Sequence, residues 1–579
     1  MALNIGLRRM QRAVSAARLA GRPVPSVIVV GAGMSGLGTG IQLKRAGVTD
    51  FTIVEQSDGV GGTWRDNTYP GSGCDVPSHL YSFSFASKTD WTRRFAEQPE
   101  ILDYAEQCVE RHGLADHLRL GTTVNDASFD EGSGRWRVSV TPAGSAGSAG
   151  SAGGGSEVLE ADAVIFAVGQ LNRPNIPDFP GLDRFTGPSW HSARWDHDVD
   201  LEGKRVAVVG SGASAIQFVP PVAEAAGQLT IFQRSTNYVV PKPDKVYGPT
   251  QRWLLEHVRA YELAYRWRIY WSLESRWLAF RKDSWAGRFL RKLITKAIRA
   301  GVVSERMPEQ SVVPDYPFGC KRLLISSDWY PAILRPTVEV VNEPIDHLEA
   351  DAVVTADGTR RPADVLIFGT GFHTTDFLAA IPVSGRGGRT LASAWADGVR
   401  AYLGITVPGF PNCFLLYGPN TNLGHNSILF MVERQLNVVL QALAAQTEAG
   451  ASVAVGAAGA AGVGGVGAPG AGDARVASTI EVTADAYDRE DARVQRLMTG
   501  TTWVNSCRSW YKTASGRVTN NWPTWTVRYW LDTLWMRPGD LRVTALPVKA
   551  GAGAGAGTDE MAPEREPASE PALANPAAG

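Results

Sequence analysis

The 579-residue sequence has few of the residues that mark secreted, metal-binding or nucleic-acid-binding proteins. Its five cysteines, at 74, 108, 320, 413 and 507, are odd in number and scattered, and they form no C-x-x-C pair. This pattern excludes a redox-active dithiol motif, predicts neither a zinc site nor a disulfide framework, and favours the reducing cytoplasm. A net charge of −1 gives no electrostatic reason to expect a nucleic-acid partner.

The sequence also lacks a convincing membrane-targeting segment. Residues 1–24 carry five arginines but no continuous apolar core, so we expect a short amphipathic leader and not a signal peptide. The longest uncharged stretch, about 449–472, is rich in Ala, Gly and Val and contains Pro469. That composition favours a flexible insertion over a membrane span.

Three low-complexity segments interrupt an otherwise globular composition of 44% hydrophobic and 20% charged residues. They are the Gly/Ser/Ala linker 142–156, the insertion 447–477 and the tail 541–579. The linker should form the tip of a hairpin between strands at Trp136–Val140 and Val158–Glu160. We expect all three segments to be disordered, because they cannot bury enough apolar surface to order themselves.

The remaining chain is long enough for two or three domains and shows a repeated β/α pattern. A buried strand at Val27–Val30 is followed by a helix ending at Ala46 and a second strand at Phe51–Val54. The unit recurs with strands at Val206–Val209 and Leu229–Phe232 and a helix that begins at Ser214. This alternation predicts an α/β fold with two Rossmann-like, doubly wound nucleotide-binding domains.

The first strand leads into the glycine loop Gly31-Ala-Gly33-Met-Ser-Gly36. Gly31 permits the tight turn, Gly33 lets the backbone approach a pyrophosphate, and Gly36 allows close helix–strand packing. The helix N-terminus then offers free N–H groups to the phosphates. Glu55 ends the second strand, where its carboxylate can accept both ribose hydroxyls. Together these features predict a dinucleotide site.

A second loop, Gly210-Ser-Gly212-Ala-Ser-Ala215, repeats the arrangement, but its second strand ends without an acid. Arg234 and Ser235 stand there instead. A guanidinium can pair with a 2′-phosphate that a carboxylate would repel, so we assign this site to NADPH. Two nucleotide sites of different chemistry predict a flavin that is reduced by a nicotinamide.

Two longer signatures accompany these loops. One runs from Gly61-Gly62-Thr-Trp64 to Tyr69-Pro70-Gly71 and Asp75, and the other contains Phe185, Gly187, His191, Trp195 and Asp196 in the pattern F-x-G-x-x-x-H-x-x-x-W-[PD]. They resemble the fingerprints of type I Baeyer–Villiger monooxygenases, flavoproteins that insert an oxygen atom beside a ketone carbonyl. The similarity extends over roughly residues 25–540. Flavin monooxygenases that oxidise nitrogen or sulfur, the alternative within this fold, usually carry Tyr or Phe where Trp195 stands.

The resemblance implies roles for particular residues. Arg322, in the pair Lys321-Arg322, would be catalytic: it would keep a C4a-peroxyflavin deprotonated and stabilise the oxyanion of the ketone adduct, with Asp75 as its orienting partner. Lys321 would meet the NADP phosphate or ribose. Trp64 and Tyr81 would line the flavin, and the backbone of Val124 would contact the adenine. His191 would couple the domains, although a purely structural histidine fits the sequence equally well.

The resemblance and the patterns together predict the domain organisation. A leader (1–24) precedes an FAD-binding domain (25–185 and 371–540), which is interrupted by an NADP-binding domain (186–245 and 311–370). A helical insertion, 246–310, is rich in Trp, Arg and Lys; a packed core with a solvated face is the favoured interpretation, and a membrane-surface patch remains the alternative. We expect a hydrophobic ketone and O₂ as substrates and no metal. A membrane-associated protein without catalytic activity is the alternative from another class.

Overall fold

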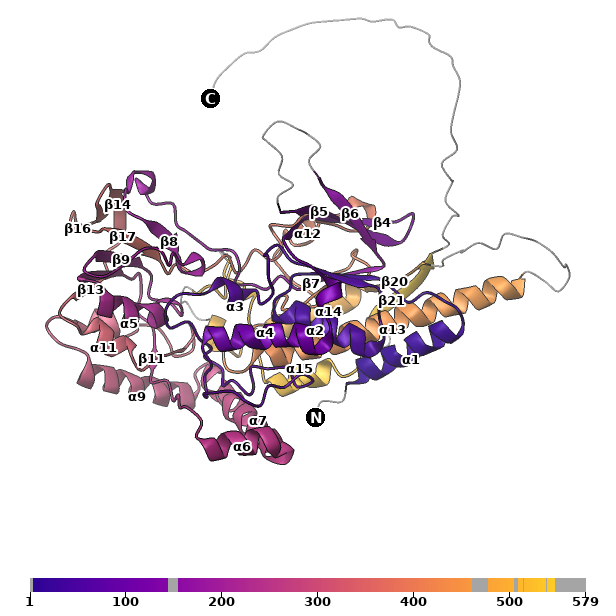
Figure 1. The fold of residues 1–579 in the computed structure, drawn as a ribbon, viewed down its shortest axis with the longest axis horizontal. Coiled ribbons are helices and arrows are strands. Elements are labelled where there is room, and N and C mark those ends of the chain that lie inside the picture. The colour runs from indigo at the N-terminus through magenta and orange to yellow at the C-terminus, as the bar shows by residue number, and fades with distance from the viewer. Residues whose placement is uncertain are drawn as a thin grey trace, which may run out of the picture.

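The computed structural model describes residues 4–143, 155–460, 477–504, 509–513, 515–537 and 539–546, and two five-stranded parallel sheets organise it (Figure 1). The first has the order β19 (Cys413–Leu415), β7 (Ala163–Phe166), β1 (Val27–Val30), β2 (Phe51–Val54) and β3 (Leu118–Arg119). The second has the order β13 (Val338–Val341), β10 (Gln228–Phe232), β9 (Arg205–Val209), β17 (Val365–Phe368) and β8 (Ser189–His191). The predicted α/β fold with two doubly wound sheets is confirmed.

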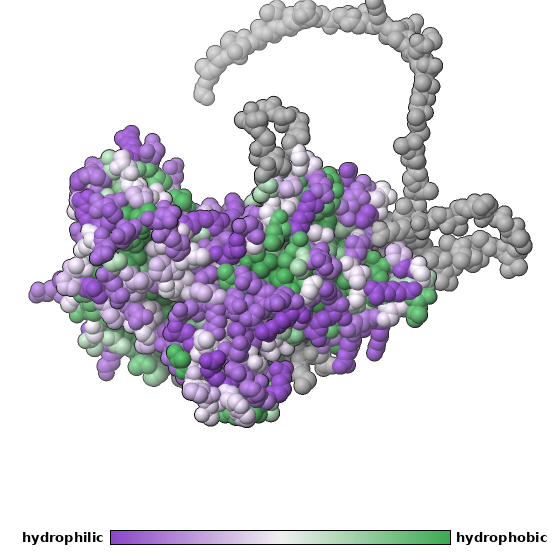
Figure 2. All heavy atoms as spheres, viewed as in Figure 1, coloured by the Kyte–Doolittle hydropathy of each residue, from purple (hydrophilic) through white to green (hydrophobic). Residues whose placement is uncertain are grey.

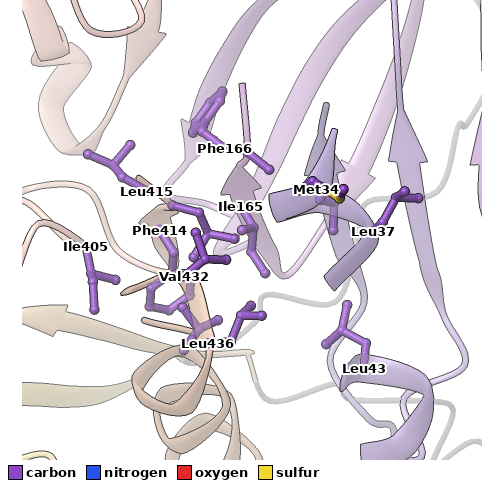
Figure 3. Packing of buried hydrophobic residues seen from close by; sticks show 14 of the residues in the cluster. Met34, Leu37, Leu43, Ile165, Phe166, Ile405, Phe414, Leu415, Val432 and Leu436 are labelled. Atoms are coloured by element: carbon purple, nitrogen blue, oxygen red, sulfur yellow. The ribbon is translucent and has the colours of Figure 1, made fainter. Parts of the chain in front are cut away.

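The main core forms where helices cover the first sheet. Every residue of β1 and β7 is buried, as expected for parallel strands that are covered on both faces. In Figure 3, Ile165 of β7, Phe414 of β19 and Leu436 of α13 (Ile428–Ala460) lie close to one another, with Leu37 of α2 (Met34–Ala46) at the other side of the view. The C-terminal part of the chain therefore completes a sheet that the N-terminal part begins.

Smaller sheets flank the two large ones. They are β18 (Val383–Ser384)–β4 (Thr122–Asp130)–β5 (Arg135–Pro142)–β6 (Glu157–Ala161), β14 (Ile345–Glu349)–β15 (Ala352–Thr355)–β16 (Arg360–Pro362), β11 (Val239–Val240)–β12 (Leu324–Ile325) and β20 (Ala477–Val482)–β21 (Leu541–Leu546). Strands β5 and β6 form the predicted antiparallel hairpin, and residues 144–154 of its tip lie outside the described residues.

The predicted helical insertion, 246–310, contains α6 (Pro249–His257), α7 (Arg259–Glu274), α8 (Trp277–Phe280) and α9 (Trp285–Gly301), and α10 (Glu309–Val312) crosses its end. Other helices are α3 (Thr63–Asp66), α4 (Gln98–His112), α5 (Ala215–Ala225), α11 (Trp329–Ile333), α12 (Leu391–Ala394), α14 (Ala484–Met498) and α15 (Thr526–Asp532). Short 3₁₀ turns occupy Ala115–His117, Leu182–Arg184, Ser192–Arg194, Arg386–Gly388 and Thr502–Val504.

The segment 1–24, which was expected to be a leader, contains a helix that is part of the fold, α1 (Ile5–Leu19). Its apolar side is buried, and the helix packs along α13. The Gly6 N–H donates to Asn437 Oδ1 of α13 at 2.8 Å, which requires close contact of the two helices. Within α13, Ile428–Gly450 is apolar enough and long enough to span a membrane, but 89% of its most apolar window is buried inside the fold. Both helices are therefore part of the protein core.

Two segments expected to be disordered contain regular structure. Residues 447–460, the start of the predicted insertion, continue α13, and residues 541–546 of the predicted tail form β21. Strand β21 is paired antiparallel with β20 along its whole length, and this partner is distant in sequence. Residues 461–476 and 547–579 lie outside the described residues.

Two further expectations concern the helical insertion and the cysteines. In the insertion Tyr265, Ile269 and Trp277 are buried, in agreement with the favoured packed core. Four of its tryptophans do not belong to that core, because they are exposed: Trp253, Trp267, Trp271 and Trp285. Cys74, Cys108 and Cys413 are free and buried, whereas Cys320 is disulfide-bonded, which the scattered cysteines did not predict.

Candidate active site

Both glycine loops open onto one cavity of about 1330 Å³, which residues of both large sheets line. The outline of the molecule dips between the two corresponding lobes (Figure 2). This volume exceeds the several hundred Å³ typical of a single drug-sized ligand. The predicted residues that line it are Gly31, Gly33, Glu55, Gly62, Trp64, Asp75, Tyr81, Val124, Gly210, Gly212, Arg234, Ser235, Lys321 and Arg322.

The first loop has the backbone geometry that a pyrophosphate needs. Gly31 adopts φ +104°, and a Cβ there would lie 2.8 Å from the Ala167 carbonyl oxygen. A Cβ on Gly36, which lies behind the cavity wall, would stand 1.8 Å from the Gly31 oxygen, so this helix–strand contact requires glycine. A Cβ on Gly33 would have no atom closer than 3.7 Å, so its backbone is open to the cavity. The first loop therefore fits a dinucleotide.

Glu55 lies beside this loop with both carboxylate oxygens engaged. Its Oε2 accepts the Ala32 N–H at 2.7 Å and its Oε1 accepts the Ser57 N–H at 2.9 Å. Each oxygen keeps a second lone pair. The carboxylate is therefore held in place by the loop that it adjoins and can still accept hydroxyl hydrogen bonds.

The second loop has a cationic cluster in place of that acid. Lys321 Nζ donates to Ser235 Oγ. Burial lowers the pKa of Lys321, and the nearby positive charge of Arg234 lowers it further. Two cations and a hydroxyl thus converge where the second strand of this unit ends, and a Cβ on Gly212 would meet nothing within 4 Å. Ala215 is the buried first residue of α5. This arrangement fits a phosphorylated dinucleotide.

Arg322 and Asp75 form an ion pair at the cavity wall, although 247 residues separate them in sequence. Their side chains are 35% and 28% exposed, so the pair faces the cavity. The negative charge of Asp75 raises the pKa of Arg322 above its ordinary value. The cavity therefore holds a guanidinium whose positive charge is permanent.

Aromatic and strand residues complete the wall on the side of the first loop. Trp64 Nε1 donates to the Tyr81 hydroxyl at 3.1 Å, and the two rings meet edge to face at 5.6 Å between centroids. Val124 lies in β4, beside a bulge that interrupts its pairing with β5. Gly62 adopts φ +54° and approaches Gly33 closely.

The sequence matches the flavin-binding monooxygenase-like family over residues 25–380, more than half of the chain. The chain belongs to this family. The predicted identity as a flavoprotein monooxygenase that uses FAD and NADP is therefore confirmed.

Individual relatives agree with the family. The chain is 39% identical to a Baeyer–Villiger monooxygenase of Streptomyces coelicolor, with 92% of this chain and 97% of the relative covered. It is 37% identical to one of Pseudomonas aeruginosa, with coverages of 90% and 92%. A solved structure of oxidised steroid monooxygenase bound to NADP superposes with a TM-score of 0.72 at 30% identity, covering 90% of this chain and 99% of that one. The predicted resemblance to Baeyer–Villiger monooxygenases is confirmed.

The second signature of this flavin monooxygenase lies outside the cavity wall. His191 ends β8; its Nε2 donates to the Gly371 carbonyl at 2.9 Å, and its Nδ1 accepts the Ala193 N–H at 3.1 Å. Burial lowers the pKa of His191 to about 4. A neutral imidazole therefore ties β8 to residues 369–371, which line the cavity.

The other residues of this signature shape the same region. A Cβ on Gly187 would lie 2.2 Å from the Asp364 oxygen, Phe185 packs in a small apolar cluster, and Asp196 Oδ1 accepts the Asp198 N–H at 3.0 Å. Trp195 contacts Tyr69 of the first signature, with 6.5 Å between ring centroids. The two signatures therefore touch each other, and their functional roles stay predictions.

Sequence reasoning missed polar residues beside Arg322. Tyr417 and Asn422 line the cavity, and the Tyr417 hydroxyl donates to Asn422 Oδ1 at 2.6 Å. Tyr417 adopts φ +57°, which is unusual for a tyrosine. No local motif marks these residues, because their position depends on β19 pairing with β7. Trp510 and Tyr511 also line the cavity, and Tyr511 is buried.

Proposed function

We propose that this enzyme inserts one oxygen atom of O₂ beside the carbonyl of a hydrophobic ketone and so forms an ester or lactone. The Asp75–Arg322 pair at a cavity shared by both glycine loops carries the proposal. The relatives named as Baeyer–Villiger monooxygenases support the same reaction. Ketone, O₂, NADPH and one proton give ester, NADP⁺ and water.

The first sheet, within residues 25–185 and 371–540, would hold FAD. Bound FAD supplies the redox and oxygen chemistry of the reaction. The first glycine loop and the N-terminus of α2 would bind the pyrophosphate, because their N–H groups and the helix dipole favour anions. Glu55 would accept the ribose hydroxyls, Trp64 and Tyr81 would line the flavin, and the Val124 backbone would contact the adenine.

The second sheet, within residues 186–245 and 311–370, would hold NADPH. Arg234, Ser235 and Lys321 would bind the 2′-phosphate, since a guanidinium, a hydroxyl and an ammonium together offer several charge-assisted donors. Phe185, Gly187, His191, Trp195 and Asp196 would fix the position of this sheet relative to the cavity. In that role His191 is a positioning residue, because its ring is neutral and both its nitrogens are engaged.

Arg322 would act on the reacting atoms directly. Its guanidinium keeps a positive charge where oxygen develops negative charge, and a donor placed there is typically worth about 3–4 kcal/mol of transition-state stabilisation. Asp75 would hold the guanidinium toward the cavity and balance its charge when no substrate is present.

The apolar part of the cavity wall indicates the class of ketone. Leu423, Ile428, Leu429 and Val432 line it, from the start of α13 and the loop before it. Apolar walls bind apolar substrates by removing their surface from water, which contributes about 25 cal/mol per Å². We therefore infer a ketone with a substantial hydrocarbon body.

Arg322→Ala tests the proposal. We expect flavin reduction by NADPH to stay within about threefold of the parent, while ester formation falls by about 100- to 1000-fold and NADPH oxidation yields hydrogen peroxide. Rapid-mixing absorbance measures reduction, and mass spectrometry with ¹⁸O₂ identifies the product from a panel of aliphatic, cyclic and aryl ketones.

Arg335→Ala, at an exposed arginine outside the cavity wall, is the matched control and should retain the parental product yield. If the Arg322→Ala variant formed ester as the parent does, Arg322 would not have the proposed catalytic role. If the parent oxidised amines or sulfides but none of the ketones, the proposed reaction would be wrong.

A further inference from the structure

Helix α9 carries a stripe of three large apolar side chains that face solvent. Trp285 is 74% exposed, Phe289 58% and Leu293 54%. They are four residues apart and so lie on one side of the helix. Gly287, Ile294 and Ile298 are buried on the opposite side. The helix is thus anchored in the fold by one apolar side, and within the described chain a second apolar side stays in water.

The neighbouring helices extend this surface. Trp267 and Trp271 of α7 are 48% and 51% exposed and stack with their ring centroids 6.4 Å apart, and Leu278 of α8 is 41% exposed. Helices α6, α7 and α9 occupy the lower edge of the molecule in Figure 1, and apolar atoms reach the surface at the lower left in Figure 2. We call Trp267, Trp271, Leu278, Trp285, Phe289 and Leu293 the aromatic face. Large apolar side chains exposed on one part of a surface mark candidate interaction sites.

The charged side chains of helix α9 itself are all positive. Helix α9 contains the five basic residues Arg288, Arg291, Lys292, Lys296 and Arg299, and no Asp or Glu. Arg288, Lys292 and Lys296 each follow a stripe residue by three positions and therefore flank the stripe. Arg299 pairs with Glu309 of α10 at 2.6 Å. Arg291 interacts with the buried Tyr238 on the packed side of the helix. Arg288, Lys292 and Lys296 therefore give α9 a positive charge along its exposed side.

Exposed tryptophan and phenylalanine flanked by cations match the boundary between lipid headgroups and acyl chains. There the rings enter the apolar layer while Lys and Arg meet anionic phosphates. A second copy of the chain bound through the same face by twofold symmetry would bring these cations against their own equivalents. The charge therefore favours an anionic lipid surface over self-association.

We propose that the aromatic face docks the enzyme on the surface of an anionic lipid bilayer. The helix would lie in the plane of the membrane surface, since its opposite side is fixed in the fold. Docking does not depend on the proposed reaction. It would place the enzyme where hydrophobic ketones accumulate.

Vesicle flotation of the FAD-loaded, full-length enzyme tests the proposal. We expect at least about tenfold stronger binding to phosphatidylcholine vesicles that contain phosphatidylglycerol than to pure phosphatidylcholine, because each cation near the surface adds attraction. Raised salt should weaken the binding. Absence of binding to the anionic vesicles would overturn the proposal.

Two double variants separate the contributions of the rings and the charges. Trp285→Ser with Phe289→Ser should lower vesicle binding by about tenfold or more, because two ring anchors are lost. Lys292→Glu with Lys296→Glu should abolish the preference for phosphatidylglycerol. Trp535→Ser removes a tryptophan that is 64% exposed outside the aromatic face, and this control should bind as the parent does.

Flavin content and NADPH oxidation without vesicles should be unchanged in all three variants, because none of the substituted residues lines the cavity; this shows that the variants fold. Unchanged vesicle binding by the Trp285→Ser/Phe289→Ser protein would overturn the proposal. Light scattering provides a second test. If the parent were a dimer and this variant a monomer, the proposal would also be overturned, because the aromatic face would then be an interface between proteins.

Discussion

At the scale of single residues, the ionisation states of the side chains around Arg322 set the charge of this part of the cavity wall. Burial raises the pKa of Tyr511 to about 12 and raises that of Tyr417, so both phenols stay neutral at physiological pH. They can donate hydrogen bonds but add no charge. Arg322 therefore contributes the permanent cation at this part of the wall, and Asp75 compensates it.

Arg234→Ala is expected to separate NADPH from NADH. Loss of a charge-assisted hydrogen bond to the 2′-phosphate costs about 1.5–3 kcal/mol, which corresponds to roughly a 10- to 100-fold higher KM for NADPH. The KM for NADH, which lacks that phosphate, should change little. Steady-state kinetics with both cofactors measures the ratio, and an equal loss with both would show that the 2′-phosphate does not bind there.

Buried histidines should make the fold sensitive to acid. Burial lowers the pKa of His191 to about 4, below the 6.5 of an unfolded histidine. Between these pH values the unfolded chain binds a proton that the folded chain does not, so the stabilisation is complete above pH 6.5 and is lost as the pH falls toward 4. His79 is shifted to about 4 for the same reason.

His191→Gln should therefore flatten the dependence of the free energy of unfolding on pH between 6.5 and 4. Urea denaturation at several pH values measures the slope. His257→Gln, at an exposed histidine of α6, is the control and should keep the parental slope. A parental slope in the His191→Gln variant would contradict the assignment.

At the scale of elements, α1 and α13 form a helix pair that joins the start of the chain to its C-terminal part. Leu7, Met10, Ala13, Val14 and Ala17 of α1 are buried, spaced so that they form one side of the helix. Without α1, the apolar side of α13 that it covers would face water. The arginines of α1, which had suggested an amphipathic leader, lie on the solvent-facing side of the helix.

Met10→Ala should lower the free energy of unfolding by about 2–5 kcal/mol, since Met10 is fully buried and its loss leaves a cavity. Ser15→Ala, on the exposed side of the same helix, should change it by no more than about 0.5 kcal/mol. Urea denaturation compares them. Equal stability of the two variants would mean that α1 does not contribute to the core.

At the scale of the whole molecule, Glu274 connects the helical insertion to the C-terminal part of the chain. Its carboxylate, at the end of α7, accepts the Thr526 N–H at 2.6 Å, the Thr526 hydroxyl at 2.7 Å and Asn426 Nδ2 at 2.8 Å. The side chain is fully buried. Three segments that are distant in sequence therefore meet at one carboxylate.

Glu274→Ala should loosen this junction. Removing one partner of a buried charged network costs about 3–5 kcal/mol, so we expect lower stability and faster proteolysis within 246–310. Glu256→Ala, at an exposed acid on α6, is the matched control and should resist proteolysis as the parent does. Parental resistance in the Glu274→Ala variant would show that other contacts hold the insertion.

The two nucleotide-binding units could be predicted from local sequence patterns. The strands at Val27–Val30 and Val206–Val209, their glycine loops and the contrast between Glu55 and Arg234 are local patterns, because neighbouring residues dictate a tight turn and a buried strand. The pairing of Asp75 with Arg322 was predicted from the resemblance of the signatures to a family. The structure brings the two side chains together.

The remaining features depend on long-range packing. The packing of α1 on α13, the pairing of β20 with β21, the position of Tyr417 beside Arg322 and the exposure of the aromatic face all depend on contacts between segments that are far apart in sequence. A short window of sequence shows that a helix has an apolar side but not whether another element covers it. Whether an apolar side is covered depends on how the whole chain packs. Here α13 covers the apolar side of α1, whereas the apolar stripe of α9 remains exposed.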